Sequence, residues 1–386
     1  MKSPIIVIAD DLTGAAEIAG IGLRYGLKVE IVTTLNLESK VDLIVISANT
    51  RSLSELEARA KTQKFAEKIA SIQPNFIFKK IDSVLRGHIL AEIEEILVEI
   101  IFQNILIIPT NPSLGRTIVN GNYFVKGVLI SETSFANDPE FAIQNAHVLK
   151  MIRAKKGEVT VLKTTENVPA RGIFIGEASS TQDVEYWAFQ ANQNTLLVGA
   201  ADFFNQNLAK RFSKESKKNT SILLNPKNAK TLYISGTTYQ KSVDAIKAKF
   251  LKNEAVSYLP IQFFIENSED FALQKWAEEI LFLFEKNPTV IIAIGEISNF
   301  QVSPNQLAKW MSLVVQKCSD KLIINQFLIE GGATAAEILS VLAYKSFIPT
   351  KEFSQGVISM KPVENQNLNI TIKPGSYEWP SEIWTF

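Results

Sequence analysis

The chain has 386 residues, of which 46% are hydrophobic and 21% charged, a composition typical of a globular protein with about two domains. Lysine and arginine (40) balance aspartate and glutamate (40), so no overall charge favours nucleic acid or an anionic membrane. A single cysteine, Cys318, excludes a disulfide framework. Because the apolar run after the initial MKSP is too short for a signal peptide or a membrane span, we expect a soluble, cytoplasmic protein.

The first half of the chain alternates between short apolar runs and helical patterns. We predict strands over 5–9, 28–33, 43–47, 75–80, 104–109, 172–175 and 196–198, and helices over 12–25, 54–71 and 88–99. This alternation is typical of right-handed βαβ units around a largely parallel sheet. Turn signals at Asn120-Gly121 and Lys126-Gly127 predict a hairpin on the rim of that sheet, within 115–138.

A polar stretch near the middle of the chain is the best candidate for a linker, which we place at 213–227. The predicted domains are then 1–212 and 228–386. In the second, we predict strands over 231–235, 255–259, 290–294, 322–329, 357–360 and 368–373, and helices over 239–251, 270–285, 304–318 and 334–342. The sequence therefore predicts two α/β domains with largely parallel sheets.

Two adjacent carboxylates, Asp10 and Asp11, follow the first apolar strand and precede a helical pattern. Ligands of open parallel sheets bind at the carboxyl ends of the strands. Two acids at such a place suit a cation or a polyol, so we interpret them as functional. The alternative is that one caps the helix and the other is solvated.

Three further polar stretches follow strands of the first half. Arg51 comes after the strand 43–47, and its guanidinium suits a carboxylate or phosphate, although a surface arginine is the alternative. The turn after 75–80 combines two cations, a carboxylate and a hydroxyl, namely Lys80, Asp82, Ser83 and Arg86. We interpret His88, at the end of that turn, as structural. Arg116, after the permissive Gly115, is a candidate anion ligand, with a rim loop as the alternative.

Glycine-containing turns mark the second half. They are Ser235-Gly236-Thr237-Thr238, Glu330-Gly331-Gly332-Ala333-Thr334 and Lys373-Pro374-Gly375. Backbone amides in such strand-to-helix turns can face phosphate oxygens, so three of them in one domain indicate a nucleotide site. The P-loop signature is absent. Gly20-Ile21-Gly22 mimics a dinucleotide fingerprint, but it falls inside the predicted helix 12–25, so we interpret it as helix packing.

Taken together, these stretches resemble the four-carbon acid sugar kinase family. The resemblance is carried by IADDLTGAAE, NTRSL, KKIDSVLRG and NPSLGRTIVNGNYFVKGVLISETSFANDP in order, and more thinly by SGTT, EGGAT and KPG. It implies a two-domain α/β kinase that transfers phosphate from ATP to the terminal hydroxyl of threonate, erythronate or 3-oxo-tetronate. It also implies a sugar-acid-binding N-terminal domain, a nucleotide-binding C-terminal domain and an active-site cleft between them.

Residue by residue, the resemblance assigns two groups. Around the sugar acid it puts Asp10, Asp11, Arg51, Lys80, Ile81, Asp82 and Ser83, to which our interpretation of the residues adds Arg86 and Arg116. Around ATP it puts Ser235, Gly331, Gly332, Ala333, Thr334 and Gly375, to which we add Gly236. The implied cofactor is ATP with Mg²⁺, but no metal ligand is identified. Ala333 stands where the family has an acidic residue, and Glu330 is a candidate substitute.

We hypothesise that Arg51 and Lys80 hold the substrate's carboxylate. One of Asp10 and Asp11 would accept the hydroxyl proton, and the other would bind hydroxyls or a magnesium-bound water. A haloacid-dehalogenase-type phosphatase is one alternative, but it requires a D-x-D spacing that Leu12 breaks. A catalytically inactive sugar-acid or nucleotide-binding relative is the other, and it is motivated by Ala333. The expected partners are small molecules, and a homodimer is the working guess for the assembly.

Overall fold

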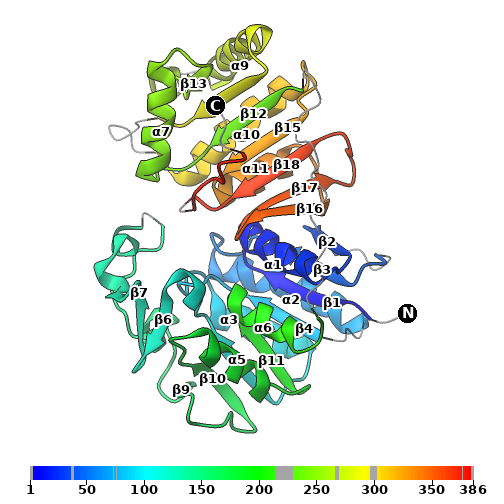
Figure 1. The fold of residues 1–386 in the computed structure, drawn as a ribbon, viewed down its shortest axis with the longest axis vertical. Coiled ribbons are helices and arrows are strands. Elements are labelled where there is room, and N and C mark those ends of the chain that lie inside the picture. The colour runs from blue at the N-terminus through cyan, green and yellow to red at the C-terminus, as the bar shows by residue number, and fades with distance from the viewer. Residues whose placement is uncertain are drawn as a thin grey trace. The chain divides into compact units, whose positions relative to one another are not determined.

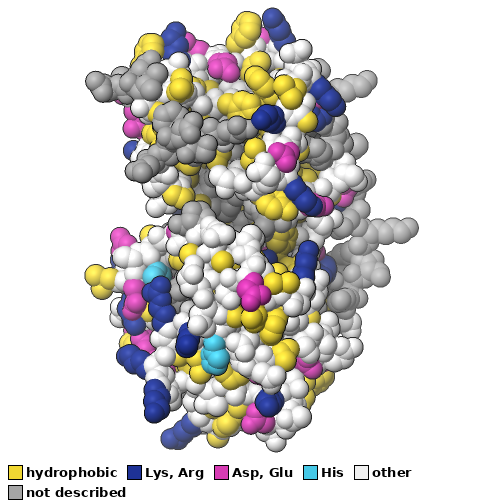
Figure 2. All heavy atoms as spheres, turned by 90° about the vertical axis from the view of Figure 1, so that its left-hand side faces the viewer, with side chains coloured by type: hydrophobic (Ala, Val, Ile, Leu, Met, Phe, Trp, Pro, Cys, Tyr) yellow, Lys and Arg dark blue, Asp and Glu magenta, His cyan; other side chains and the backbone are white. Residues whose placement is uncertain are grey.

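The computed structural model describes residues 3–35, 39–72, 74, 76–138, 140–213, 229–265, 269–295, 302–375 and 377–383. The chain divides into two compact units, residues 1–217 (unit 1) and 218–386 (unit 2), as Figure 1 shows. The predicted linker, 213–227, lies outside the described residues apart from residue 213. On the face drawn in Figure 2, basic and acidic side chains are interspersed, in keeping with the balanced charge. No helix among the described residues combines the length and apolarity that crossing a bilayer requires.

Unit 1 is built on a parallel sheet, whose described strands run in the order β2-β3-β1-β4-β11-β5-β10-β9. These strands are β1 (Ile5–Ala9), β2 (Val29–Val32), β3 (Leu43–Ser47), β4 (Phe76–Lys80), β5 (Asn104–Ile108), β9 (Val159–Leu162), β10 (Gly172–Gly176) and β11 (Thr195–Gly199). The helices are α1 (Leu12–Arg24), α2 (Glu55–Ile72), α3 (Ile89–Glu99), α4 (Val148–Met151), α5 (Thr181–Gln190) and α6 (Ala201–Ala209). The strands and helices predicted for this half are confirmed to within a few residues. The sequence prediction missed β9, α4, α5 and α6.

Strand β1 shows why this sheet forms. All five of its residues, IIVIA, are buried, as expected of a central parallel strand covered by helices on both faces. Helix α1 packs closely on its neighbours, because a Cβ added to Gly22 would lie 2.6 Å from Leu43 Cδ2 and 2.9 Å from Val29 Cγ2. Gly22 therefore serves helix packing, which confirms the interpretation of the Gly-x-Gly pattern.

A small antiparallel sheet forms on the segment predicted as a hairpin. Its strands are β6 (Arg116–Val119), β7 (Asn122–Val125) and β8 (Val128–Leu129), next to the 3₁₀ turns Pro112–Leu114 (η1), Ile130–Glu132 (η2) and Ser134–Asn137 (η3). Both connecting turns have positive φ at their two central residues, 49° and 72° at Asn120-Gly121 and 51° and 83° at Lys126-Gly127. This is the backbone that tight hairpins favour, so the turn prediction is confirmed and a third strand is added.

Unit 2 has a mixed sheet, whose described strands run in the order β13-β14-β12-β15-β18-β17-β16. The strands are β12 (Thr231–Ser235), β13 (Val256–Tyr258), β14 (Thr289–Ala293), β15 (Gln326–Glu330), β16 (Ser346–Ser354), β17 (Val357–Pro362) and β18 (Asn369–Lys373). The helices are α7 (Gln240–Leu251), α8 (Gln262–Ile265), α9 (Glu269–Lys286), α10 (Pro304–Ser319) and α11 (Gly332–Val341). Pairing is parallel from β13 to β18 and antiparallel from β18 through β17 to β16. β16 and α8 were not predicted, and β15 begins four residues later than the predicted 322.

Each sheet has a point where the chain reverses its direction of travel across the strands. In unit 1, β1 pairs with β3 on one side and β4 on the other. In unit 2, β12 pairs with β14 on one side and β15 on the other. The loops leaving neighbouring strands diverge at such a point and open a crevice at the carboxyl ends, which is where doubly wound proteins bind ligands.

Candidate active site

Three side chains from two strand ends of unit 1 form the centre of the candidate site. Asp10 follows β1, and Asp11 caps α1 by accepting the Gly14 N–H at 2.9 Å. Arg51, in the turn after β3, donates to both oxygens of Asp10, from Nε to Oδ2 at 2.8 Å and from Nη2 to Oδ1 at 3.0 Å. Its Nη1 also lies 3.1 Å from Asp11 Oδ2. One guanidinium thus holds both carboxylates in place.

This pairing favours the charged forms of Asp11 and Arg51. Burial alone would raise the pKa of the Asp11 carboxyl, but Arg51, Lys80 and the helix-cap hydrogen bonds hold it below its usual value. Burial would likewise lower the pKa of Arg51, and Asp10 and Asp11 instead raise it well above the ordinary value. Asp11 is therefore a carboxylate at neutral pH, as a proton acceptor must be.

The turn after β4 adds a second layer of ion pairs. Asp82 accepts from Arg86 at 2.7 Å (Nε) and 3.1 Å (Nη2), and Arg86 also contacts Asp138 at 3.0 Å. Asp82 lies 3.9 Å from Arg51, which joins the two layers. Although burial would raise the pKa of Asp82, Arg86 and Arg51 hold it far below the usual range. Charges of opposite sign therefore alternate through this end of the sheet.

Arg116 reaches the same turn from strand β6. Its Nη1 donates to the hydroxyl of Ser83, and its guanidinium carbon lies 5.9 Å from the centre of the Phe135 ring. Arg86 lies at the same distance from that ring. Within the described residues, Arg116 has no ion-pair partner, which distinguishes it from Arg51 and Arg86. It is the cation of this cluster best able to accept an external anion.

The two lysines that end β4 point to opposite faces of the sheet, as alternate strand residues do. Lys79 pairs with Glu92 of α3, and both side chains are buried. Lys80 lies 3.6 Å from Glu17 of α1, donates to the Ile81 carbonyl at 3.1 Å and is 3% exposed. Lys80 is thus an internal cation that balances the acids at the start of α1.

The structure shows how two residues singled out in the sequence, Ile81 and His88, are placed. The Ile81 side chain is fully buried in the hydrophobic core of unit 1, so only its main chain is available to a ligand. His88 precedes α3, and its Nε2 lies 2.7 Å from the Leu53 carbonyl oxygen, as expected of a structural histidine. Sequence reasoning missed Asp138 and Phe135, although both lie in the NPSLGRTIVNGNYFVKGVLISETSFANDP stretch that carried the resemblance.

The three glycine turns of unit 2 meet at one edge of its sheet. Ser235 pairs with Glu330, which pairs with Lys373, so β12, β15 and β18 end side by side. A Cβ on Gly236 would lie 1.9 Å from Thr334 Oγ1, and one on Gly375 would lie 2.7 Å from Thr237 Oγ1. These close approaches explain why glycine occupies both positions.

Gly331 has a φ of 107° and precedes the ten-residue helix α11. Its backbone conformation is one that side chains rarely adopt. The positive N-terminal end of α11 and the amides of the converging turns fit the phosphate groups of a nucleotide. Ala333 lies exposed in the first turn of that helix. No group of three or more metal-binding side chains is present in the described part of the chain.

Glu330 is fully buried at the end of β15 and is held by three side chains. Lys373 Nζ lies 2.6 Å from its Oε1, Tyr233 donates to its Oε2 at 2.6 Å, and the Ser242 hydroxyl donates to its Oε1. Burial and the carboxylate raise the pKa of Tyr233 well above its ordinary value. These contacts leave Glu330 with a structural role, so the structure does not favour it as a substitute for the acid missing at 333.

The fold defines a doubly wound α/β protein, and the charged strand ends of unit 1 form a candidate site for a polyol or an anion. Residues 5–212 match the family model described as the sugar-binding N-terminal domain, and the chain belongs to that family. Leu12, where a D-x-D phosphatase would have its second acid, is buried in the core. This geometry is at odds with the phosphatase alternative.

Curated relatives include a 3-oxo-tetronate kinase of Haemophilus influenzae, 26% identical over 403 residues and 96% of each chain. A D-threonate kinase of Salmonella typhimurium is 27% identical over 222 residues, which cover 52% of each chain. Among solved structures, a Haemophilus influenzae protein of the DUF1537 family superposes with a TM-score of 0.71 at 22% identity, covering 97% of each chain. That likeness shows a shared fold.

Proposed function

We propose that this chain is an ATP-dependent kinase that phosphorylates the terminal hydroxyl of a four-carbon sugar acid, such as threonate, erythronate or 3-oxo-tetronate. The observation that carries the proposal is the Asp10–Arg51–Asp11 cluster at the reversal point of the unit 1 sheet. It combines carboxylates for hydroxyl groups with nearby cations for an acid, in a family named for sugar binding. The kinase names of the relatives that align over 96% of the chain support the same function.

In the proposed reaction, Asp10 or Asp11 accepts the proton of the attacking hydroxyl, and the other binds a second hydroxyl. Arg51 orients both carboxylates, because its donors already face them. We assign the substrate's carboxylate chiefly to Arg116, since Arg51 and Lys80 have acidic neighbours of their own. Asp82 and Arg86 keep Ser83 and its turn in place.

The nucleotide is assigned to unit 2, with its phosphates at Ser235, Gly236, Gly331–Thr334 and Gly375. Mg²⁺ bound with ATP would neutralise charge on the transferred phosphate. The backbone amides of these turns would orient the phosphate chain, and the glycines at 236 and 375 would let the turns approach one another closely enough to do so. We further propose that the functional domains are residues 1–212 and 228–386.

A coupled ADP-release assay with a panel of four-carbon acids tests this function. The expected result is ATP-dependent turnover with one or a few stereoisomers, with phosphate on the terminal oxygen of the product. The panel includes both epimers at each hydroxyl-bearing carbon and the 3-oxo acid. A folded protein that releases no ADP with any acid would contradict the kinase function.

The role of Arg116 has a separate test that compares an acid with its neutral analogue. Arg116→Met should raise KM for the sugar acid by roughly 10- to 100-fold, because a hydrogen bond to a charged group is worth about 1.5–3 kcal/mol. The same substitution should leave the weak activity on the corresponding four-carbon polyol unchanged, since the polyol has no carboxylate. An equal loss on both substrates would show that Arg116 only maintains the structure.

The alternative function is a sugar-acid or nucleotide-binding protein without turnover, and Ala333 in the second glycine turn favours it. Calorimetry distinguishes the two, because a binding protein would bind a four-carbon acid or ATP without releasing ADP. Restoring an acid with Ala333→Asp adds a second comparison. A rise in turnover in that variant would indicate an impaired kinase. The predicted homodimer is tested independently by measuring mass in solution.

A further inference from the structure

A hollow in unit 1 lies beside the candidate active site, and the proposed reaction places no ligand in it. Its volume is about 240 Å³, and its lining comes from residues 84–88 and 141–145 together with Lys150, Met151 and Arg153. The floor is apolar, because Val84, Leu85 and Ile143 are buried and Met151 is half-buried. Since a water molecule occupies about 30 Å³ in the liquid, the hollow suits a molecule of a few carbon atoms.

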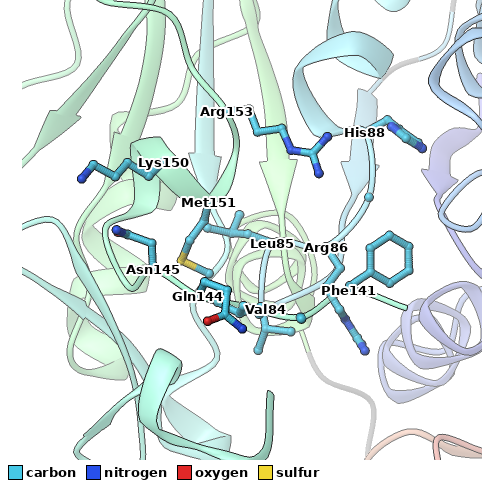
Figure 3. Close-up of a pocket in the computed structure, with 13 residues that line it drawn as sticks. Val84, Leu85, Arg86, His88, Phe141, Gln144, Asn145, Lys150, Met151 and Arg153 are labelled. Atoms are coloured by element: carbon cyan, nitrogen blue, oxygen red, sulfur yellow. The ribbon is translucent and has the colours of Figure 1, made fainter. Parts of the chain in front are cut away.

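The charged and titratable side chains that line this hollow are Arg86, His88, Lys150 and Arg153, with no carboxylate among them. Asp82 and Asp138 already neutralise Arg86. Lys150 and Arg153 are exposed, and neither has an ion-pair partner within the described residues. In Figure 3, Arg153 extends toward His88, whereas Lys150 lies at the opposite rim beside Asn145. Two positive charges that have no ion-pair partner among the described residues therefore lie at opposite rims of one apolar hollow.

The backbone of both lining segments adopts conformations that are rare for side-chain-bearing residues. Leu85 has a φ of 63°, Arg153 a φ of 57° and Gly87 a φ of 93°. Leu85 is only 4% exposed, so its packing holds the turn in this form. Such strained backbone conformations persist only where the surrounding structure holds them in place, and they are often found at binding and switching sites.

The hollow and the candidate active site share one wall. A Cβ on Gly87 would lie 3.5 Å from Arg51 Cγ and 3.8 Å from Asp10 Oδ2. Arg86 lines the hollow and at the same time holds Asp82. On the other side, Asp138 accepts the N–H of Phe141, another lining residue, at 2.8 Å. A molecule in the hollow would thus press on the turn that carries the substrate-facing side chains.

We propose that this hollow binds a small phosphate-bearing anion through Lys150 and Arg153, and that the bound anion changes the affinity of the neighbouring site for its sugar acid. A phosphate monoester carries nearly two negative charges at pH 7, which match the two positive charges of Lys150 and Arg153. Its short carbon chain would lie on the apolar floor. The binding of the anion does not depend on the proposed kinase function. The effect of the anion on sugar-acid affinity rests on that function.

Calorimetric titrations test the binding step on the full chain, with ADP present to occupy the nucleotide turns. Inorganic phosphate and a phosphorylated four-carbon sugar acid are titrated separately into the wild type and the Lys150→Ala/Arg153→Ala variant. We expect the double substitution to raise Kd at least tenfold. The matched control is Lys155→Ala/Lys156→Ala, which removes the same charge from exposed residues outside the lining, and it should change Kd by less than twofold.

An unchanged Kd in Lys150→Ala/Arg153→Ala, or an equal loss in the control, would overturn the site. Tighter binding of the sugar-acid phosphate identifies an organic phosphate as the ligand, and equal binding of both probes identifies free phosphate. For the coupling, the sugar-acid Kd should shift at least threefold when the anion is present, in the wild type and the control only. A wild type that binds phosphate at Lys150 and Arg153 but no sugar acid would refute the proposed function and leave the hollow's ligand established.

Discussion

The candidate sites of the two units lie at the same topological position, the carboxyl ends of the strands where the strand order reverses. They differ in the groups that form them. In unit 1, the strand ends carry charged side chains, which form a network around Arg51 and Asp82. In unit 2, the strand ends carry glycines, and a buried ion pair, Lys373–Glu330, lies behind the turns. Side chains can distinguish the hydroxyls and carboxylate of a small substrate, whereas backbone amides suit the repeated oxygens of a phosphate chain.

The largest expected effect tests whether the charged side chains of unit 1 carry out the catalytic step. Asp10→Asn or Asp11→Asn, whichever removes the base, should lower kcat by about 10²- to 10⁴-fold, because the hydroxyl loses its proton acceptor. ADP affinity, measured by calorimetry, should stay unchanged, since neither residue lies in unit 2. Glu67→Gln, on the exposed side of α2, serves as the control for loss of a negative charge. Wild-type turnover in both aspartate variants would refute the catalytic assignment.

A second prediction concerns the ion pair behind the glycine turns. Lys373→Met should destabilise the protein by about 3–5 kcal/mol, because it leaves the Glu330 carboxylate buried with only hydroxyl partners. Urea unfolding at pH 7 measures this loss. Adding Glu330→Leu should recover much of it, since an apolar pair of similar volume is often neutral. A loss below about 1 kcal/mol in the single variant would show that Lys373 is not needed to balance Glu330.

A methyl group at Gly236 tests whether the glycine turns of unit 2 bind the nucleotide. Gly236→Ala should weaken ADP binding about tenfold or more, because the new Cβ would overlap the Thr334 side chain and displace the turn. Sugar-acid binding in unit 1 should not change. Gly157→Ala is a suitable control, because it adds a methyl group at an exposed glycine where no atom lies within 4 Å. Unaltered ADP affinity in Gly236→Ala would place the nucleotide elsewhere.

The smallest expected effect is the acid dependence of stability. Arg86 and Arg51 outweigh burial and hold the pKa of Asp82 below its unfolded value of 3.8, so the folded state binds this proton less readily. The resulting stabilisation is complete above that value and is lost as pH falls toward the folded pKa. Asp82→Asn should therefore be less stable than the wild type at pH 7, and below pH 4 its stability should fall less steeply, by up to about 1.4 kcal/mol per pH unit.

Urea unfolding between pH 2 and 7 measures this difference in slope. Glu67→Gln again provides the comparison, because it removes an exposed carboxylate from the same unit. A slope in Asp82→Asn equal to that of the wild type would mean that the Asp82–Arg86 pair does not govern acid sensitivity.

Much of the molecule could be read from the sequence by itself. Strands such as β1 and β3 are uniformly apolar, so their burial and parallel pairing followed from composition and alternation. Asp10, Asp11 and Arg51 were recognisable because polar residues at strand ends gather at one edge of a parallel sheet. Strand β16 was missed because its residues alternate too weakly in burial to give a period-2 signal.

Only the tertiary structure decided which partner each polar residue contacts and therefore which role it can have. Arg51 and Arg116 both follow a strand or turn in the sequence, yet Arg51 holds two aspartates whereas Arg116 contacts a hydroxyl and an aromatic ring. Glu330 and Lys373, 43 positions apart, become partners because β15 and β18 are neighbours in register. The physical reason is that a residue's type fixes the interactions it can form, whereas strand order and burial fix which partner it meets.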